Sequence, residues 1–433
     1  MLKPTKSVPL RLAGIGCGAR TRAYLSLAAA MPDKYAVVGA ADPIQERVDR
    51  VRRECGNRPG FRSFRDDTEL LAAGKFADVV VIGTQDNYHV EPCVAAMEAG
   101  YDVLLEKPVA TNLQDLFRLE KRARALGRKV LVCHVLRYTP FYRKVKGIVN
   151  SGRLGSVMTI NATEGVGAWH HAHSYVRGHW GVVRKASPMI LAKSCHDLDI
   201  ISWLMDSPCE MISSFGGLSY FRRENAPCDA PPRCADGCPV GDSCIYNALR
   251  YITDKSNWLG FVFDHADNAK PSEIREWLSR SPWGRCVYQC ENTAVDHQVA
   301  SMVFQNQATA TFSMTAFEHG RHIEIFGTAG RLRAGAAVKR LSGHDIEVRD
   351  HESEAAEFID LTGPHGDYAG HGDGDAALIS ALYDEMSHTS SDDMATSLKA
   401  SLESHVLAFA AEEARRTGAT VSMDSFVSDA AVE

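Results

Sequence analysis

The chain has 433 residues, of which 45% are hydrophobic and 24% are charged, with a formal net charge of −6 and an isoelectric point near 6.3. The length exceeds what one ordinary core needs and predicts a soluble protein of two domains. The apolar runs are too short to span a membrane and the acidic balance offers no basic surface for nucleic acid, so we expect neither partner. The first residues lack an apolar signal region, which favours a cytoplasmic location.

Residues 1–135 contain an alternation of short β-rich runs and helical stretches. The strand-like runs are LRLAGIG, YAVVGAAD, ADVVVIGT, YDVLLEKP and KVLVCH. Strands that alternate with helices of this length are typical of an α/β domain with a doubly wound parallel sheet.

The pattern changes from about residue 136 onward. The strand-like runs are SVMTINATEG, MISSFGGLSY, HQVASMVFQ, TATFSMTAF and HIEIFGT, and few helices separate the later ones. This favours an α+β domain with a mostly antiparallel sheet over residues 136–433. Residues 222–289 are rich in Pro, Asp, Cys and Trp without clear periodicity, which indicates an insertion. An amphipathic C-terminal helix over residues 396–417 precedes Gly418 as its C-cap.

The segment GIGCGA follows the first predicted strand and precedes a helix, which fits the dinucleotide-binding pattern G-x-G-x-x-A. Gly14 is expected to permit the tight turn, Gly16 to let the backbone approach a pyrophosphate, and Ala19 to allow close helix packing. Asp42 ends the second strand, where its carboxylate would accept hydrogen bonds from ribose hydroxyls. NAD is therefore favoured as the cofactor, while the nearby Arg47 keeps NADP as an alternative.

Several motifs, in the same order along the chain, resemble those of the glucose-fructose oxidoreductase/inositol dehydrogenase/MocA family. They are GIGCGAR, the AAD of the second strand, GTQDNYHVEPCVAAMEAGYDVLLEKP, RYTPFY, CHDLDIISWL, IFGTAG and SHVLAFAAEEARRTG. The resemblance implies a Rossmann domain followed by a large open sheet that covers the nicotinamide and often builds the interface of a homo-oligomer, a dimer or tetramer. It also implies an NAD(P)-dependent enzyme that acts on the CH–OH group of a small polyol, sugar, glycoside or cyclitol.

The resemblance assigns cofactor-binding residues to the carboxyl ends of the Rossmann strands. These residues are Gly14, Gly16, Cys17, Gly18, Ala19, Arg20, Asp42, Thr84, Asn87, His89, Glu106, Lys107 and Arg137. Lys107, in the E-K-P motif, is expected beside the nicotinamide and the reacting hydroxyl, where its charge would stabilise a developing alkoxide. His89 could instead be a helix-start residue that packs locally.

A second group of catalytic candidates lies at the start of a predicted helix, in KSCHDLD. The family has its acid/base histidine at the place of His196, and a histidine with a near-neutral pKa suits removal of a hydroxyl proton. Asp199 lies three residues later, on the same face of the helix. Many members have an aspartate four residues before the histidine, where this chain has Ala192, so we expect Lys193 to replace that polar partner. A structural role at the helix start is the alternative for His196.

The segment WHHAHSYVRGHW combines aromatic faces with hydrogen-bonding side chains, which suits a polyol. The substrate-binding candidates are Trp169, His170, His173, Tyr175, Arg177, Asp199 and His297. Metal binding by the histidines is the weaker interpretation, because no acidic residue has regular ligand spacing with them.

Four cysteines lie close together in the predicted insertion: Cys228, Cys234, Cys238 and Cys244. The surrounding segment is too polar and Pro-rich to form its own core, so we expect a metal to stabilise it. Four thiolates favour structural zinc, and an iron–sulfur cluster, disulfides or unligated thiols are the alternatives.

Three functions are compatible with these motifs. The leading hypothesis is a dehydrogenase in which hydride passes to NAD, His196 accepts the proton and Lys107 steadies the oxygen. A close alternative is an NAD-dependent enzyme that cleaves glycosides through transient oxidation. A non-catalytic sensor of the same fold is the third, and the presence of both Lys107 and His196 counts against it.

Overall fold

The computed structural model describes residues 8–361 and 371–432, which form two compact units. The first unit comprises Met1–Arg143, His371–Val406 and Ala430–Glu433, and the second comprises Lys144–Gly370 and Leu407–Asp429. Residues 371–406 therefore pack with the N-terminal part of the chain. The functional boundary predicted between residues 135 and 136 stays a prediction.

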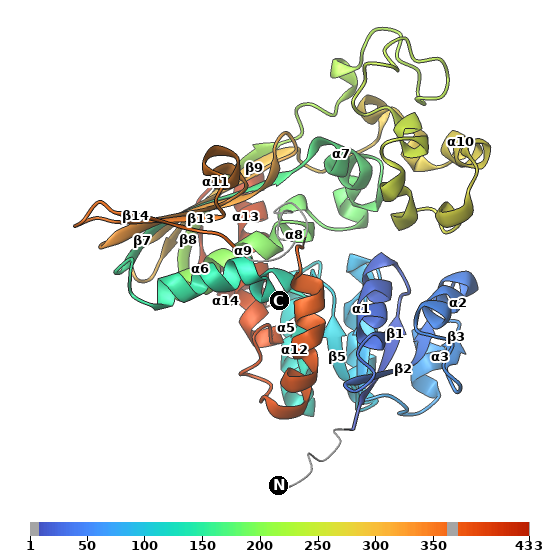
Figure 1. Cartoon of the computed structure of the whole chain (residues 1–433), viewed down its shortest axis with the longest axis horizontal. Helices are drawn as coiled ribbons and strands as arrows, with labels where there is room; N and C mark the ends of the chain where they lie inside the picture. Colours follow the sequence, from blue (N-terminus) through green and yellow to red (C-terminus); the bar gives the residue numbers. More distant parts are fainter. Residues whose placement is uncertain (1–7, 362–370, 433) are drawn as a thin grey trace. The chain divides into compact units, whose positions relative to one another are not determined.

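The sheet of the first unit has six parallel strands in the order β3-β2-β1-β4-β5-β6. The strands are β1 (Leu10–Ile15), β2 (Tyr35–Ala41), β3 (Arg62–Phe64), β4 (Val79–Ile82), β5 (Asp102–Leu105) and β6 (Val130–Val132). The helices are α1 (Ala19–Ala29), α2 (Gln45–Glu54), α3 (Asp67–Ala72), α4 (Val90–Glu98), α5 (Leu113–Leu126) and α12 (Gly374–His388), several of which are labelled in Figure 1. The predicted doubly wound parallel sheet is confirmed. Its strand order changes direction between β1 and β4, the position where such sheets bind ligands.

Local sequence explains these elements. The four residues of β4, VVVI, are all buried, and an apolar run of this kind suits a parallel strand covered on both faces. Helix α5 begins after Asn112, whose side chain accepts the N–H of Asp115 at 2.8 Å, and it ends at Gly127 in the left-handed conformation. These are the start and stop signals that a helix requires.

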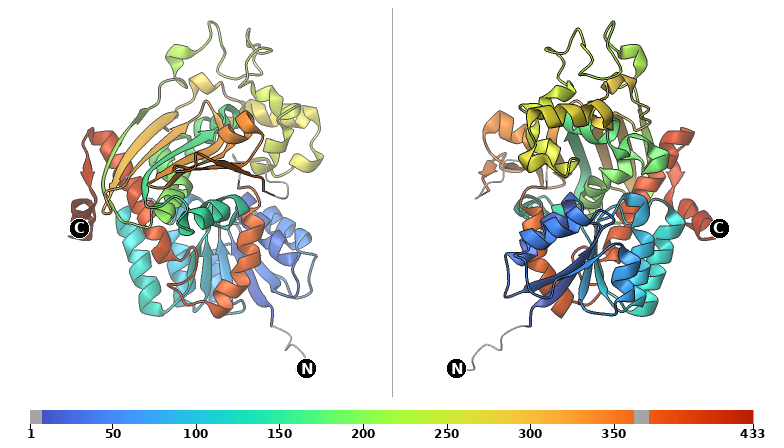
Figure 2. Two further views of the ribbon diagram at one scale, coloured as in Figure 1. Left: turned by 60° about the vertical axis from the view of Figure 1, so that its left-hand side comes forward. Right: turned by 90° about the vertical axis from the view of Figure 1, so that its right-hand side faces the viewer.

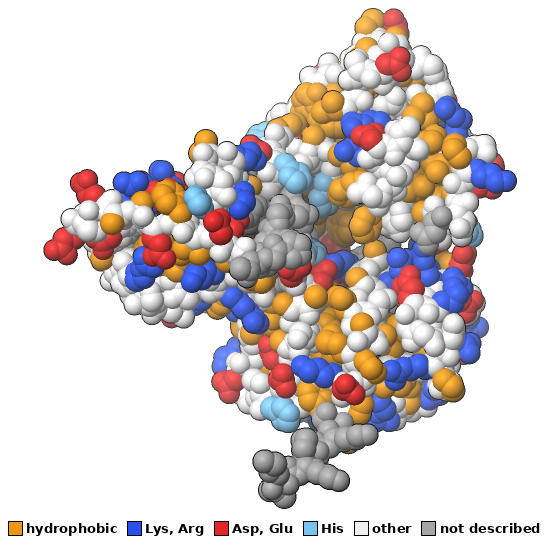
Figure 3. All heavy atoms as spheres, in the orientation of Figure 1, with side chains coloured by type: hydrophobic (Ala, Val, Ile, Leu, Met, Phe, Trp, Pro, Cys, Tyr) orange, Lys and Arg blue, Asp and Glu red, His pale blue; other side chains and the backbone are white. Residues whose placement is uncertain are grey.

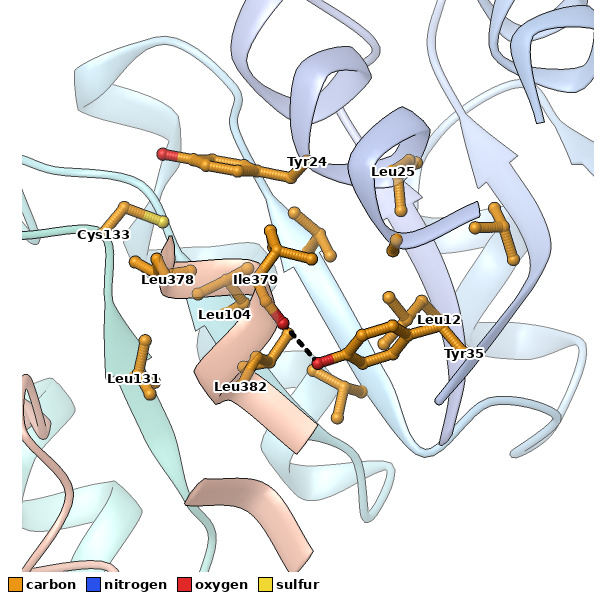
Figure 4. Packing of buried hydrophobic residues seen from close by; sticks show 14 of the residues in the cluster. Leu12, Tyr24, Leu25, Tyr35, Leu104, Leu131, Cys133, Leu378, Ile379 and Leu382 are labelled. Atoms are coloured by element: carbon orange, nitrogen blue, oxygen red, sulfur yellow. Dashed lines mark hydrogen bonds between the residues drawn. The ribbon is translucent and has the colours of Figure 1, made fainter. Parts of the chain in front are cut away.

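Helix α12 completes the hydrophobic core of the first unit. Leu378, Ile379 and Leu382 are fully buried in one cluster with residues of β1 and β2. The hydroxyl of Tyr35, on β2, donates a hydrogen bond of 2.6 Å to the carbonyl of Ile379, drawn as a dashed line in Figure 4. A segment far away in the sequence is thus part of the N-terminal core.

The second unit is built on a nine-stranded sheet in the order β14-β13-β12-β11-β7-β10-β9-β8-β15. The strands are β7 (Val157–Val166), β8 (Cys209–Gly217), β9 (His297–Phe304), β10 (Thr309–Thr315), β11 (His319–Gly327), β12 (Gly330–Gly335), β13 (Ile346–Asp350), β14 (Ala356–Ile359) and β15 (Val421–Ser422). Among the strand pairs of this sheet that the structure describes, only β10–β7 is parallel, so the predicted mostly antiparallel sheet is confirmed. Figure 2 shows it as one open, twisted sheet.

Helices of the second part of the chain are mostly short. They are α6 (Pro140–Asn150), α7 (Ala168–His171), α8 (Met189–Ala192), α9 (Cys195–Met205), α10 (Pro271–Arg280), α11 (Ala336–Ser342), α13 (Leu398–Thr417) and α14 (Met423–Val432). The predicted C-terminal helix is α13, and Gly418 follows it with a φ of +71°, as expected of a C-cap.

The insertion over residues 222–289 contains a small core, whose buried residues lie outside the cysteine segment that we expected to lack one. Tyr251, Leu259, Ile274 and Leu278 form a buried cluster with Trp169. Apart from α10 the segment consists of turns, bends and short 3₁₀ helices. Ile274 and Leu278 lie one turn apart on α10, whereas Tyr251 and Leu259 lie in 3₁₀ helices. Apolar residues in short 3₁₀ helices follow neither the α-helical nor the strand period, so the sequence pattern did not show the whole core.

The described surface is mixed in charge. On the face shown in Figure 3, acidic and basic side chains are interspersed over both units. Within residues 8–361 and 371–432, no helix is long and apolar enough to cross a membrane.

Replacing Leu382 tests the packing of α12. Leu382→Ala should lower the free energy of unfolding by about 2–5 kcal/mol, because it leaves a cavity in the buried cluster. Leu341→Ala is the matched control, since Leu341 is 90% exposed and its change should stay within about 0.5 kcal/mol. Urea unfolding measures both, and equal effects would refute the role of α12 in the core.

Candidate functional site

The loop after β1 has the shape that a dinucleotide requires. Gly16 has a φ of +77°, and a Cβ atom there would lie 2.9 Å from the backbone nitrogen of Thr84. Gly14 lies inside β1, where a Cβ would lie 2.8 Å from Leu25 and 2.9 Å from Thr21 of α1. The tight turn predicted at Gly14 is therefore made by Gly16, and Gly14 instead permits close packing of the helix on the strand. The approach of the Gly16 backbone to a pyrophosphate stays a prediction.

The start of helix α1 suits an anion. Its N-cap residue is Gly18, which offers no side chain to the first-turn amides, and the first turn carries no acidic residue. Unsatisfied N–H groups and the positive end of the helix dipole then favour a phosphate at this position. Together with the bare backbone at Gly16, this arrangement fits a pyrophosphate.

Asp42 fixes the same loop from the end of β2. Its Oδ2 accepts the N–H of Cys17 at 2.8 Å, and its Oδ1 accepts the N–H of Ile44 at 2.9 Å. A carboxylate has about four acceptor positions, so these two bonds leave capacity for ribose hydroxyls. Burial and Asp42 raise the pKa of the Cys17 thiol, while Arg47 acts in the opposite direction. Arg47 therefore lies within electrostatic range of the loop, and the choice between NAD and NADP stays a prediction.

A buried carboxylate holds the loop after β5. Glu106 Oε1 accepts hydrogen bonds from Arg20 Nε at 2.9 Å and from the Tyr24 hydroxyl at 2.6 Å, while Oε2 accepts the N–H of Lys107 at 3.0 Å. Arg20 also donates to both oxygens of Asp375, on α12, at 2.7 and 2.6 Å. Burial alone would raise the pKa of Glu106, but Arg20 and Lys107 outweigh it and lower the pKa. Arg20 and Glu106 thus support the loop that presents the half-buried Lys107.

His89 connects two of the strand-end loops. Its Nδ1 lies 2.6 Å from the carbonyl of Pro108 after β5, and its Nε2 lies 3.2 Å from the carbonyl of Thr84 after β4. The ring is buried at the start of α4, which agrees with the alternative of local packing. Asn87 on the same loop is exposed, and Thr84 is half-buried.

Sequence reasoning missed a pair of buried histidines beside Lys107. His134 follows β6, and its ring contacts that of His405 edge-on at 5.4 Å. His405 Nε2 accepts the N–H of Val109 at 2.9 Å, so its proton must be on Nδ1, which faces the Ser401 carbonyl at 2.8 Å. Burial, Arg137 and Lys107 lower the pKa of His134 well below its usual range. The sequence signals were the motif SHVLAFA, which contains His405, and the strand-like run KVLVCH, which ends at His134.

Arg137 has a packing role in the first unit. It is buried, and its guanidinium donates to the carbonyls of Ala395 at 3.0 Å and Ala400 at 3.3 Å. These bonds attach Ala395, before α13, and Ala400, in the first turn of α13, to the end of the Rossmann sheet. Its predicted contact with the cofactor stays a prediction.

In the second unit, His196 lies in the first turn of α9 and is 1% exposed, and Asp199 is fully buried one turn later. Asp197 of the same helix belongs to a cluster of four buried charged side chains, with Glu164, Lys193 and Arg321. Lys193 Nζ is 3.3 Å from Glu164, and Arg321 Nε is 2.6 Å from Glu164 and 2.7 Å from Asp197. Lys193 thus has an acidic partner on β7, and the sequence did not identify either Glu164 or Arg321.

The charge cluster contains a group that titrates near neutrality. Burial raises the pKa of Glu164 to about 7, although Arg321 and Lys193 oppose the shift. Two cations and two carboxylates balance when Glu164 is ionised, and one positive charge is left when it is protonated. Glu164 lies on β7, which contacts α9, the helix that carries His196.

Most of the histidine-rich segment is buried against the insertion. Trp169, Tyr175 and Arg177 are less than 10% exposed, and His173 Nδ1 hydrogen-bonds the hydroxyl of Tyr251. Burial, helped by Arg177, lowers the pKa of His173 to about 3, so the ring is neutral at physiological pH. These contacts give the segment a structural role, and its contact with a substrate stays a prediction.

The remaining predicted substrate residues differ in exposure. His170 is half-buried and its ring lies 4.9 Å from that of Trp258. His297 is exposed at the start of β9, where its Nδ1 lies 2.7 Å from Asp296 Oδ1. Asp296 is itself buried and accepts backbone N–H groups of Ser219 and Tyr220. This carboxylate orients the His297 ring.

The four predicted cysteine ligands do not all lie together. Cys228 is exposed, whereas Cys234, Cys238 and Cys244 are partly buried, and none forms a disulfide. Within the described ranges, no three His, Cys, Asp or Glu side chains have the arrangement of metal ligands. The sequence-based zinc site is not supported in that form.

Known proteins resemble the chain over most of its length. An oxidoreductase family model with an NAD-binding Rossmann fold matches residues 10–134, and a Gfo/Idh/MocA C-terminal domain model matches residues 142–333. The Bacillus subtilis (strain 168) protein YteT, named as an oxidoreductase, is 25% identical over 331 residues, which cover 73% of this chain and 75% of that protein. Inositol 2-dehydrogenase 1 of Saccharopolyspora erythraea is 29% identical over 174 residues, 40% of this chain and 47% of that protein.

Solved structures show the same fold. Scyllo-inositol dehydrogenase from Lactobacillus casei, with NAD(H) and scyllo-inositol bound, matches with a TM-score of 0.64 and 16% sequence identity. The match covers 96% of this chain and 100% of that one.

The pKa of Glu164 predicts a pH-dependent stability. Between its ordinary value of 4.5 and about 7 the folded protein binds more protons than the unfolded chain, so the free energy of unfolding falls as pH rises. The slope from this group is at most about 1.4 kcal/mol per pH unit, and it is absent in Glu164→Gln. Urea unfolding of both proteins from about pH 5 to about pH 8 measures the difference. Parallel profiles would contradict the raised pKa.

Proposed function

Because the chain belongs to the Gfo/Idh/MocA family of oxidoreductases, we propose that it transfers hydride from a hydroxyl-bearing carbon of a cyclitol, sugar or glycoside to NAD. One observation carries the proposal. Lys107 stands at the carboxyl end of β5, fixed by the buried Glu106, in the same unit as a loop shaped for a pyrophosphate. Rossmann sheets bind their cofactor at the carboxyl ends of the strands. A cation at that edge is suited to stabilise negative charge on the oxygen of a substrate that reacts with the cofactor.

NAD is the proposed cofactor rather than NADP. The first-turn amides of α1 would hold its pyrophosphate, and Asp42 would accept hydrogen bonds from the adenosine ribose. The charge of Asp42 would also repel a 2′-phosphate. When bound, the nicotinamide supplies the hydride acceptor.

The proposed substrate class rests on two relatives. Inositol 2-dehydrogenase 1 and scyllo-inositol dehydrogenase are both named for cyclitols, and their hydroxyl-bearing carbons resemble those of sugars and glycosides. The activity and substrate are proposals, because the match to inositol 2-dehydrogenase 1 covers less than half of that protein.

We propose a separate role for each of two residues, His196 and Lys107, in this reaction. As the C–H bond breaks with its electron pair, the O–H bond must also break, and His196 would accept that proton. Lys107 would stabilise the negative charge that develops on the oxygen as the carbonyl forms. The charge cluster around Lys193 would hold the helix that carries His196.

The open face of the nine-stranded sheet supports the proposal of a homo-oligomer. Phe215 on β8 and Val299 on β9 lie opposite each other across the two strands, and they are 62% and 45% exposed. A second copy of the chain would cover this apolar pair.

An activity screen tests the proposed reaction. The purified full chain should reduce NAD steadily, followed by absorbance of NADH, with at least one member of a panel of inositols, sugars and glycosides, and should reduce NADP more slowly. Release of an aglycone without net NADH would indicate glycoside cleavage instead. Binding of ligand with neither product would point to a sensor and would refute the dehydrogenase.

Lys107→Ala should lower kcat about 100-fold or more, because it removes the charge that stabilises the alkoxide. Affinity for NAD, measured by fluorescence titration, should change little because the pyrophosphate loop is intact. Lys121→Ala, an exposed lysine of the same unit, is the control and should keep full activity. An unchanged kcat in Lys107→Ala would show that Lys107 has a structural and not a catalytic role.

A further inference from the structure

A small cavity in the second unit is surrounded by four cysteines. Cys234, Cys238, Cys244 and Cys286 line it, with a volume of about 20 Å³. A space of this size holds about one water molecule or one ion. Three of these residues belong to the cluster in the sequence, and the fourth lies far beyond it.

Cys286 is brought to the cavity by backbone pairing. The N–H of Cys234 bonds the carbonyl of Gly284 at 3.1 Å, and the N–H of Cys286 bonds the carbonyl of Pro232 at 2.8 Å. Arg233 and Arg285 form the antiparallel bridge between these two segments. This register places Cys234 opposite Gly284 and Cys286 opposite Pro232, and both cysteines line the same cavity, which no spacing along the chain could indicate.

Cys228, the remaining cysteine of the sequence cluster, lies in a solvent-exposed environment outside this cavity. Its thiol lies 3.4 Å from the Asp229 carboxylate. Cys286 therefore lines the cavity in place of Cys228, the fourth ligand expected from the sequence.

A second observation comes from Arg177, which also lines the cavity. Its side chain is buried, its Nη2 lies 3.6 Å from the sulfur of Cys234, and its Nε donates to the carbonyl of Arg285 at 2.7 Å. Among the described residues its Nη1 is buried without a hydrogen-bond partner. A buried cation with an unused donor is stabilised by negatively charged acceptors, and thiolate sulfurs are such acceptors.

We propose that Cys234, Cys238, Cys244 and Cys286 bind one Zn²⁺ ion as thiolates. Each thiol loses its proton on binding, and the resulting centre carries a charge of −2, of which Arg177 offsets one unit. The thiols line the cavity without yet having the arrangement of metal ligands within the described chain, so binding must draw the sulfurs inward. The segment that carries three of them consists of turns and bends, which can make this movement.

The size of the cavity favours a single ion. An iron–sulfur cluster contains several irons and sulfides and needs more room than a single ion. A lone Zn²⁺ with four thiolates is a closed structural site, with no open position for a substrate.

Metal analysis of the full chain, grown with added zinc, tests the proposal. The wild-type protein should contain one zinc per chain, and Cys286→Ser should lose it. Cys228→Ser is the matched control and should keep the full zinc content, as should Cys290→Ser, whose thiol donates to the Cys286 carbonyl at 3.3 Å instead.

A measurement on the wild-type protein avoids variants that fail to fold. Removing the metal with a chelator should expose four additional thiols to a thiol reagent, and adding zinc back should protect them again. Zinc-free protein, loss of zinc from Cys228→Ser, or iron with visible absorbance would each overturn the assignment.

Discussion

Glu106 is a carboxylate enclosed by the first unit, and such a group stays ionised only if cations and donors surround it. Arg20 comes from the helix that would hold the pyrophosphate, and Tyr24 comes from the next turn of that helix. The same arginine reaches Asp375 on α12, so one network joins the nucleotide loop, the loop of Lys107 and the returning C-terminal helix. The position of Lys107 depends on all three.

The second unit repeats this arrangement with different residues. His196 is followed directly by Asp197, which pairs with the buried Arg321, as Lys107 directly follows Glu106. In both units a proposed catalytic side chain is adjacent in sequence to a member of a buried ionic network. Such networks restrict the backbone, and a side chain on a restricted backbone needs little reorganisation when the reaction occurs.

Short-range patterns predicted the parts of the fold that depend on neighbouring residues. The GIGCGA loop, the buried strand VVVI and the C-cap at Gly418 follow from local geometry, although Gly16 and not Gly14 makes the tight turn. Glu164 and Arg321 were not identified, because a single charged residue in a strand does not indicate that it is buried or which residue pairs with it. Cys286 was missed because backbone pairing, not sequence spacing, brings it to the cavity.

The return of α12 has a consequence for the order of synthesis. All six strands of the first sheet leave the ribosome before Leu378, Ile379 and Leu382 have been made. The apolar surface near Leu12 and Tyr35 therefore stays exposed until α12 is synthesised, while the second unit is translated. During this period nascent chains are prone to aggregate. A fragment ending at Arg143 would expose that surface permanently, so this Rossmann unit, unlike a purely N-terminal one, is not separable by a single cut.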